Sequence, residues 1–125
     1  MKKILTTWGP VVLWCGLIFF LSSQPHLPGP EDKTWDFVLK KAGHLTVYFI
    51  LFRLVYRAYG KQTKHRMLRT FLICIAYAAS DEFHQSFVPG RTPMIRDIGI
   101  DIIGMIGSGI LARYERKIPS ASRKN

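Results

Sequence analysis

The chain has 125 residues, of which 48% are hydrophobic, and its formal net charge is +10 at pH 7. This length predicts one domain. A basic charge of this size is typical of nucleic-acid-binding proteins, but no aromatic residues interleave with the basic ones as they do on RNA-binding surfaces, so we expect no nucleic acid partner. The hydrophobic residues gather instead into four runs along the chain.

The first run, residues 4–21, reads ILTTWGPVVLWCGLIFFL and has no charged residue. As a helix it would be about 27 Å long at 1.5 Å per residue, close to the roughly 30 Å hydrocarbon core of a bilayer. No small-residue cleavage motif follows it, so we expect an uncleaved membrane span. The prolines of LSSQPHLPGP then forbid a continuing helix.

The second predicted span covers residues 42–57, and the preceding EDKTWD is a candidate helix start. Lys41, His44 and Tyr48 follow one another at i, i+3 and i+7. This spacing places all three on one helical face.

The third predicted span covers residues 68–88, provided that the helix continues through DEFHQSFV to Val88. Asp81, Glu82 and Gln85 then share one side of the helix, with His84 at its margin, while the phenylalanines of this stretch face lipid. Two other interpretations stay open. DEFHQ could be an exposed loop above a short span, or its charges could form a structural ion-pair network that holds the helices together.

The fourth predicted span covers residues 94–112, after the turn VPGRTP, in which Thr92 and Pro93 are expected to cap and open the helix. Asp97, Asp101, Gly104 and Ser108 recur at i, i+4, i+7 and i+11, so one face is acidic at its start and small further on. The basic tail, residues 117–125, is predicted to be disordered.

The basic residues alternate between the two ends of these spans. Thirteen Lys and Arg fall in the segments on one side and five on the other, whereas seven of the eight acids fall beside the second group. Membrane proteins keep their basic loops in the cytoplasm. The sequence therefore predicts an all-α integral membrane protein of the cell (inner) membrane: a compact bundle of four transmembrane helices in one multi-pass domain, with both termini cytoplasmic.

Three of the spans bring ionisable groups to a similar depth. Such groups are costly in a membrane, so they normally face one another or water and mark a functional site. Neither a metal site nor a cofactor is predicted, because no established ligand spacing is present. The candidate acid/base groups are Asp81, Glu82, His84 and His44, and the candidate binding groups, among which the cations could clamp a phosphate or carboxylate, are Lys41, Tyr48, Gln85, Arg91, Arg96, Asp97 and Asp101.

Most of the chain resembles the VanZ-like family of small bacterial membrane proteins, which is named for an accessory protein of glycopeptide resistance. The resemblance begins at LSSQP, continues through KAGHLTVYFILF and is most specific in YAASDEFHQSFVPGRTPMIRDIGIDIIGMIG. The family pattern falls on His44, Tyr48, Asp81, Glu82, Gln85, Pro89, Gly90, Arg91, Asp97 and Gly104, and Asp101 stands where the family also has Asn.

The resemblance implies a cell-envelope protein of the inner membrane, and for the family's namesake a low-level resistance to teicoplanin. Our first hypothesis is that this chain confers such resistance through an outward-facing polar pocket whose chemistry, enzymatic or not, stays open. The alternatives are a non-catalytic protein that changes the access of drug or lipid, and a proton-coupled transporter. The expected partners are membrane lipids, a lipid-linked cell-wall precursor or the glycopeptide itself, and the oligomeric state is not predicted.

Overall fold

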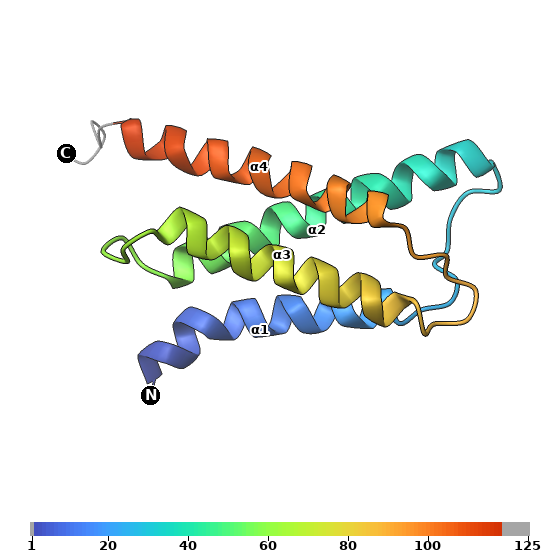
Figure 1. The fold of residues 1–125 in the computed structure, drawn as a ribbon, viewed down its shortest axis with the longest axis horizontal. Helices are drawn as coiled ribbons and strands as arrows, with labels where there is room; N and C mark the ends of the chain where they lie inside the picture. Colours follow the sequence, from blue (N-terminus) through green and yellow to red (C-terminus); the bar gives the residue numbers. More distant parts are fainter. Residues whose placement is uncertain (1, 119–125) are drawn as a thin grey trace, which may run out of the picture.

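The computed structural model describes residues 2–118, and within them it contains four α-helices and no strand (Figure 1). The predicted all-helical class is confirmed. The tail expected to be disordered begins at residue 117, but Lys117 is the last residue of α4; residues 119–125 of this tail lie outside the described residues. The helices are α1 (Lys2–Ser22), α2 (Lys33–Ala58), α3 (Arg66–Gln85) and α4 (Ile95–Lys117).

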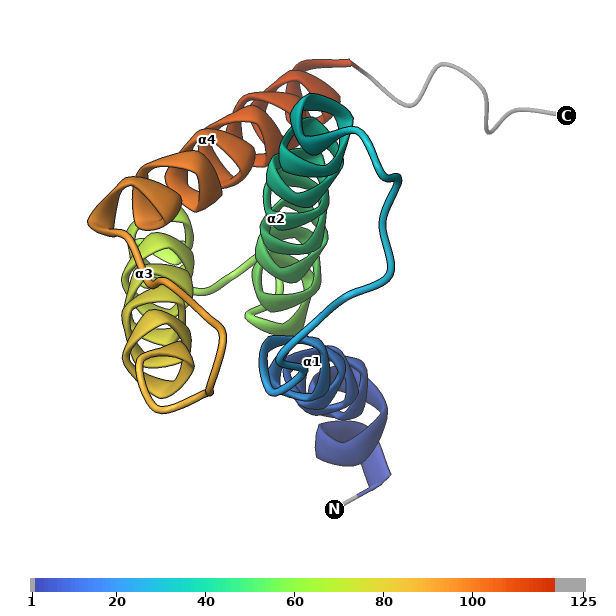
Figure 2. The ribbon, with the colours of Figure 1, turned by 90° about the vertical axis from the view of Figure 1, so that its right-hand side faces the viewer.

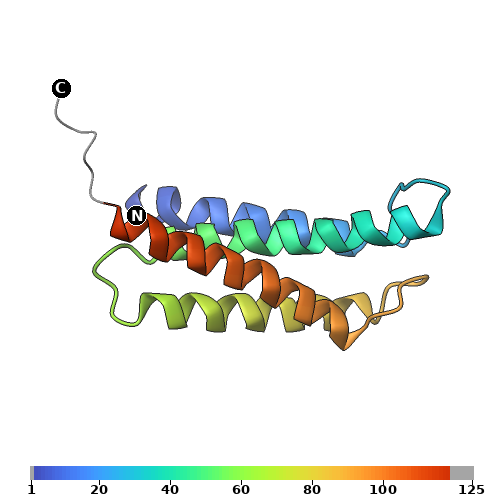
Figure 3. The ribbon, with the colours of Figure 1, turned by 90° about the horizontal axis from the view of Figure 1, so that it is seen from above.

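The helices lie side by side along the long axis of the molecule (Figure 1). The α1–α2 connection (residues 23–32) and the α3–α4 connection (residues 86–94) lie at one end, which we call the acidic end. The α2–α3 connection (residues 59–65), the start of α1 and the end of α4 lie at the other, the basic end. Seen along the bundle, α2 lies between α1 and α4 (Figure 2). Helix α2 packs most extensively against α4, which lies obliquely to the other helices when seen from above (Figure 3).

The helix boundaries at the acidic end follow local capping. The carboxylate of Asp32 accepts hydrogen bonds from the backbone N–H groups of Thr34 and Trp35, at 2.9 and 3.0 Å, so EDKTWD does begin a helix. Helix α2 therefore starts nine residues before the expected span. Hydropathy marks the part of a helix suited to lipid, whereas the cap marks where the helix begins.

The expected boundaries of the other two helices need correction. Helix α3 ends at Gln85 rather than Val88, because backbone bonds three residues apart tighten residues 86–88 into turns ahead of Pro89. The expected cap of α4 by Thr92 and Pro93 is wrong, since the N-cap is Met94 and no side chain bonds the helix from that position. Glu82 of α3 instead accepts the N–H of Met94, so the start of α4 is fixed by a neighbouring helix.

Helices α2 and α4 approach each other closely at Gly104. A Cβ atom at this position would collide with the backbone carbonyl of Leu45, so only glycine permits the contact. Ser108, one turn further along α4, is also fully buried. The predicted face of small residues is therefore the face that packs against α2. Around it lie the largest buried side chains, among them Tyr48, Phe52 and Met105.

Burial follows an unusual pattern. Four carboxylates are buried, those of Asp81, Glu82, Asp97 and Asp101, while large hydrophobic side chains are exposed on all four helices. Proteins in water normally bury the second kind and expose the first. Among the described residues, one helical segment, Ile4–Ser22, is long and apolar enough by composition to cross a membrane.

Candidate functional site

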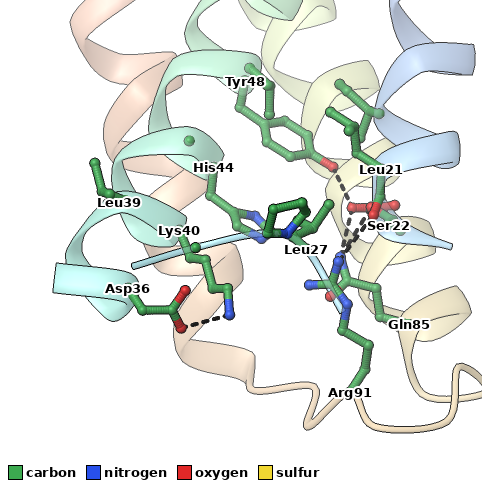
Figure 4. A pocket seen from close by; sticks show the side chains of 16 residues that line it. Leu21, Ser22, Leu27, Asp36, Leu39, Lys40, His44, Tyr48, Gln85 and Arg91 are labelled. Carbon is green, nitrogen blue, oxygen red and sulfur yellow. Dashed lines mark hydrogen bonds and ion pairs between the residues drawn. The ribbon is translucent and has the colours of Figure 1, made fainter. Parts of the chain in front are cut away.

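A cavity of about 330 Å³ opens at the acidic end, between α1, α2, α3 and the α1–α2 connection (Figure 4). Figure 4 shows His44 and Tyr48 reaching it from α2, and Gln85 and Arg91 reaching it from the opposite side. Its walls combine polar groups with aliphatic side chains. Five of the predicted site residues line it: His44, Tyr48, Asp81, Gln85 and Arg91.

The floor of the cavity is a hydrogen-bonded network around Asp81. One carboxylate oxygen, Oδ2, accepts from the hydroxyl of Tyr48 at 3.4 Å and from the amide of Gln85 at 3.1 Å. The same amide nitrogen donates to the hydroxyl of Ser22 at 3.2 Å, which brings α1 into the network. The other oxygen, Oδ1, is buried without a hydrogen-bond partner. Native proteins leave few buried polar atoms unpaired, so this oxygen is an unsatisfied acceptor next to the floor of the cavity.

His44 forms one wall, with Asp101 behind it. The ring nitrogen Nδ1 lies 3.2 Å from Oδ1 of Asp101, whose side chain is almost fully buried between the helices. In the neutral imidazole this bond holds the proton on Nδ1 and leaves Nε2 as an acceptor. A carboxylate that orients a histidine in this way is typical of proton-transfer sites, although it also occurs as a plain structural bond.

Arg91 ties the α3–α4 connection to the end of α1. Its Nε donates to the carbonyl of Gln24 and its Nη2 to the carbonyl of Leu21, both at 3.0 Å. Leu21 lies in the last turn of α1 and Gln24 lies two residues beyond it, where backbone carbonyls lack the N–H partners of a continuing helix. Two of the three guanidinium nitrogens thus donate to the backbone. Arg91 therefore holds the α3–α4 connection against the end of α1 and also lines the cavity.

The remaining predicted site residues do not line the cavity. Lys41 and Asp97 form an ion pair between α2 and α4, and Glu82 accepts the N–H of Met94. His84 stacks on Phe19 of α1, with ring centroids 4.3 Å apart. Arg96 is exposed and lies 3.2 Å from the sulfur of Met94. The predicted constellation therefore divides into a cavity group and a group that holds helices together.

The cavity also contains residues that the sequence analysis missed. Asp36 and Lys40, an ion pair at 2.7 Å, lie on its rim together with Gly43, and Ser22 lies in its floor. The signal was present in the sequence: Asp36, Lys40, Gly43 and His44 are spaced i, i+4, i+7 and i+8, which is one helical face. It was lost because the span was expected to begin only at residue 42.

Metal binding gains no support from the geometry. No group of three or more His, Cys, Asp or Glu side chains that could hold a metal ion occurs among residues 2–118. Apart from Oδ1 of Asp81, the polar groups of the cavity described above form hydrogen bonds or ion pairs with protein groups instead. They suit hydrogen bonding and proton transfer.

Comparison with known proteins identifies the family of the chain. A family model described as VanZ/LLP1 matches residues 7–114, which include every predicted site residue and all residues that line the cavity. No curated protein and no solved structure matches the chain. Since the family model spans most of the sequence, the chain belongs to the VanZ/LLP1 family.

Proposed function

We propose that this chain is a multi-pass protein of the bacterial inner membrane that lowers sensitivity to teicoplanin, and that the cavity at the acidic end is the site on which this effect depends. Membership of the VanZ/LLP1 family supports the envelope role, since the namesake of the family acts in glycopeptide resistance. The observation that carries the proposal is the convergence of His44, Tyr48, Asp81 and Gln85 at one cavity.

The membrane placement rests on the burial pattern. Each helix has 20 or more residues, so each reaches about 30 Å, the thickness of a hydrocarbon core. Buried carboxylates and exposed aliphatic side chains are what a lipid environment demands. The polar residues buried in α3 and α4, which lower the hydropathy of these helices, are Thr70, Asp81, Glu82, Gln85, Asp97, Asp101 and Ser108.

The orientation rests on charge. Most of the basic residues belong to the basic end, where α1 starts and α4 ends, so this end would be cytoplasmic and would hold both termini. The cavity would then face outward. In this orientation the cavity would lie near the outer surface of the membrane, the side on which the drug meets the lipid-linked precursor of the wall.

Two roles are compatible with the cavity. In the first, His44, oriented by Asp101, accepts a proton from a bound group while Asp81 holds that group. In the second, the cavity only binds a drug or lipid and changes its access. The aliphatic walls, which include Ile18, Leu21 and Val47, favour the second role as strongly as the His44–Asp101 contact favours the first.

The decisive experiment is teicoplanin and vancomycin susceptibility in a host that lacks this gene. The host is complemented with wild type, His44→Gln or Asp81→Asn at matched membrane abundance. Glu115→Gln serves as the control, because it removes one negative charge at the basic end. We expect wild type and Glu115→Gln to protect against teicoplanin and Asp81→Asn to fail. Loss of protection in His44→Gln would favour proton transfer, and retained protection would favour binding. Full protection by both cavity variants would refute the proposal.

A further inference from the structure

The cavity has two chemically different parts. Its inner part is polar and contains the buried Ser22, Asp81 and Gln85. Its side walls are aliphatic, with Ile18, Leu21, Leu39 and Val47 supplied by α1 and α2. A small polar solute would leave the aliphatic walls without contacts, whereas a hydrocarbon would leave the polar part unpaired. The shape therefore suits an amphiphile whose head enters first.

The polar part specifies the chemistry of that head. Asp81 is 5% exposed, and its Oδ1 atom has no hydrogen-bond partner. None of the ion pairs formed by the described residues includes this carboxylate. A buried carboxylate that lacks a cation is best satisfied by a group that both donates a hydrogen bond and carries positive charge. A primary ammonium has both properties.

The rim of the cavity indicates the rest of the head group. Leu39, Lys40 and Gly43 of α2 are exposed while they line the cavity, so access lies along this side of α2. Lys40 stands at the rim, and Arg91, with Nε and Nη2 bonded to carbonyls, lines the interior. Asp36 balances the charge of Lys40 at 2.7 Å, whereas Arg91 has no acidic partner among the described residues. A phosphate next to the ammonium would therefore meet the positive charge of Arg91.

We propose that the cavity binds one zwitterionic phospholipid with a primary-ammonium head, which places the ammonium on Asp81 and the first acyl carbons against the aliphatic walls. The proposal rests on the proposed function in so far as it takes this cavity as the site of the protein and as open to the membrane. It names the ligand class of that site.

The test uses the purified full chain, stripped of lipid in detergent, and measures lipid retention by native mass spectrometry. Four lipids with identical acyl chains are compared: phosphatidylethanolamine, phosphatidylcholine, phosphatidylglycerol and phosphatidic acid. Phosphatidylcholine keeps the positive charge but has no N–H donor, and phosphatidylglycerol keeps donors but has no positive charge. We expect phosphatidylethanolamine to bind about tenfold or more tightly than the other three, the range of one charge-assisted hydrogen bond.

Variants tie this preference to the cavity. Asp81→Asn should reduce the affinity for phosphatidylethanolamine to that for phosphatidylcholine, while Glu115→Gln should leave the preference intact. Gly43→Leu should abolish retention of all four lipids, because a Cβ at Gly43 meets no atom within 4 Å and the larger side chain would occupy the cavity without displacing backbone. Gly99→Leu is the matched control, since Gly99 is an exposed helical glycine on α4 with equally open surroundings.

The outcomes separate this inference from the proposed function. Equal retention of phosphatidylethanolamine and either phosphatidylcholine or phosphatidylglycerol would overturn the ammonium assignment, even in wild type alone, as would a preference unchanged in Asp81→Asn. If protection against teicoplanin still depended on Asp81, only the ligand class would have failed. If instead the lipid preference held while Asp81→Asn still protected cells, the lipid site would stand and the proposed function would fall.

Discussion

The α2–α4 interface and the cavity both contain buried carboxylates, but they treat them differently. At the interface Lys41 meets Asp97 and His44 meets Asp101, so each acid has a basic partner on the facing helix. In the cavity Asp81 has only neutral donors, and one of its oxygens has none. A paired buried charge is explained by the fold it holds together, whereas an unpaired one calls for a ligand. Asp97 and Asp101 thus differ from Asp81, which has no basic partner, within a single small bundle.

The largest effect should come from breaking the interface at its closest point. Gly104→Ala places a Cβ against the Leu45 carbonyl, which belongs to a helix backbone and cannot rotate away. We expect a loss of about 3 kcal/mol in the free energy of unfolding, at the upper end of overpacking effects. Thermal unfolding in detergent measures the change, with Gly99→Ala as the control that adds the same methyl in open space. Equal unfolding temperatures for the two variants would show that α2 and α4 are not packed this closely.

Removing one member of the interface ion pair should have the next largest effect on stability. Asp97→Asn leaves the partly buried Lys41 without a counter-charge, and we expect a loss of about 2 kcal/mol. The double variant Lys41→Met with Asp97→Asn should regain most of the loss, because neither charge then remains unpaired. Thermal unfolding of the two single variants and the double variant gives the coupling directly. If the double variant were as unstable as the sum of the singles, the pair would not be a structural contact.

Asp81→Asn should leave the stability of the protein almost unchanged but remove its function, unlike Asp97→Asn, which should lower stability. Asparagine keeps an oxygen that can accept from Tyr48 and Gln85, so the free energy of unfolding should change by less than about 1 kcal/mol. Protection against teicoplanin should nevertheless disappear, because the charge is gone. Measuring both properties on the same membranes tests the distinction between structural and functional acids. A strongly destabilised Asp81→Asn that regained protection at low temperature would place Asp81 among the structural acids.

The smallest effect should come from an ion pair at the surface. Arg53 and Glu115 bond at 2.8 and 3.0 Å near the basic end, where the glutamate side chain is about half exposed. Exposed pairs contribute little, so Glu115→Gln should cost less than about 0.5 kcal/mol and leave protection unchanged. Thermal unfolding and susceptibility again provide the readout. A large loss of stability or of protection would mean that the basic end contributes to function as well as the cavity.

The sequence predicted the helices better than their ends. The four apolar runs of the sequence correctly located the four helices, because every helix contains a stretch rich in hydrophobic residues. The starts of α2 and α4 each depend on one carboxylate instead: Asp32 accepts from two N–H groups of its own helix, but Glu82 of α3 accepts the N–H of Met94 at the start of α4. A cap donated by another helix leaves no local pattern to read.

The candidate site was predicted as a set of residues but not as an arrangement. Asp81 and Glu82 are adjacent in the sequence, yet successive helical residues point about 100° apart, so one faces the cavity and the other faces the start of α4. Arg91 bonds backbone carbonyls, which look the same in every sequence, so its partners could not be inferred from residue types. The i, i+3, i+7 spacing correctly placed Lys41, His44 and Tyr48 on one helical face. It could not show that this face contacts two different helices, α4 and α3.

The contrast between α1 and the other helices has a consequence for how the protein is made. On the proposed membrane placement, α1 is apolar enough to leave the insertion machinery alone. Helix α2 carries Lys41 and His44, whose acidic partners are synthesised more than fifty residues later on α4. Until α4 arrives, α2 must hold these groups unpaired, so its stable insertion depends on a helix not yet translated. We therefore expect α2 to cross the membrane poorly in a chain that lacks α4. In the same shortened chain, Lys41→Met should let α2 cross fully, because it removes the unpaired charge. Glycosylation mapping would measure how much of α2 crosses in each case.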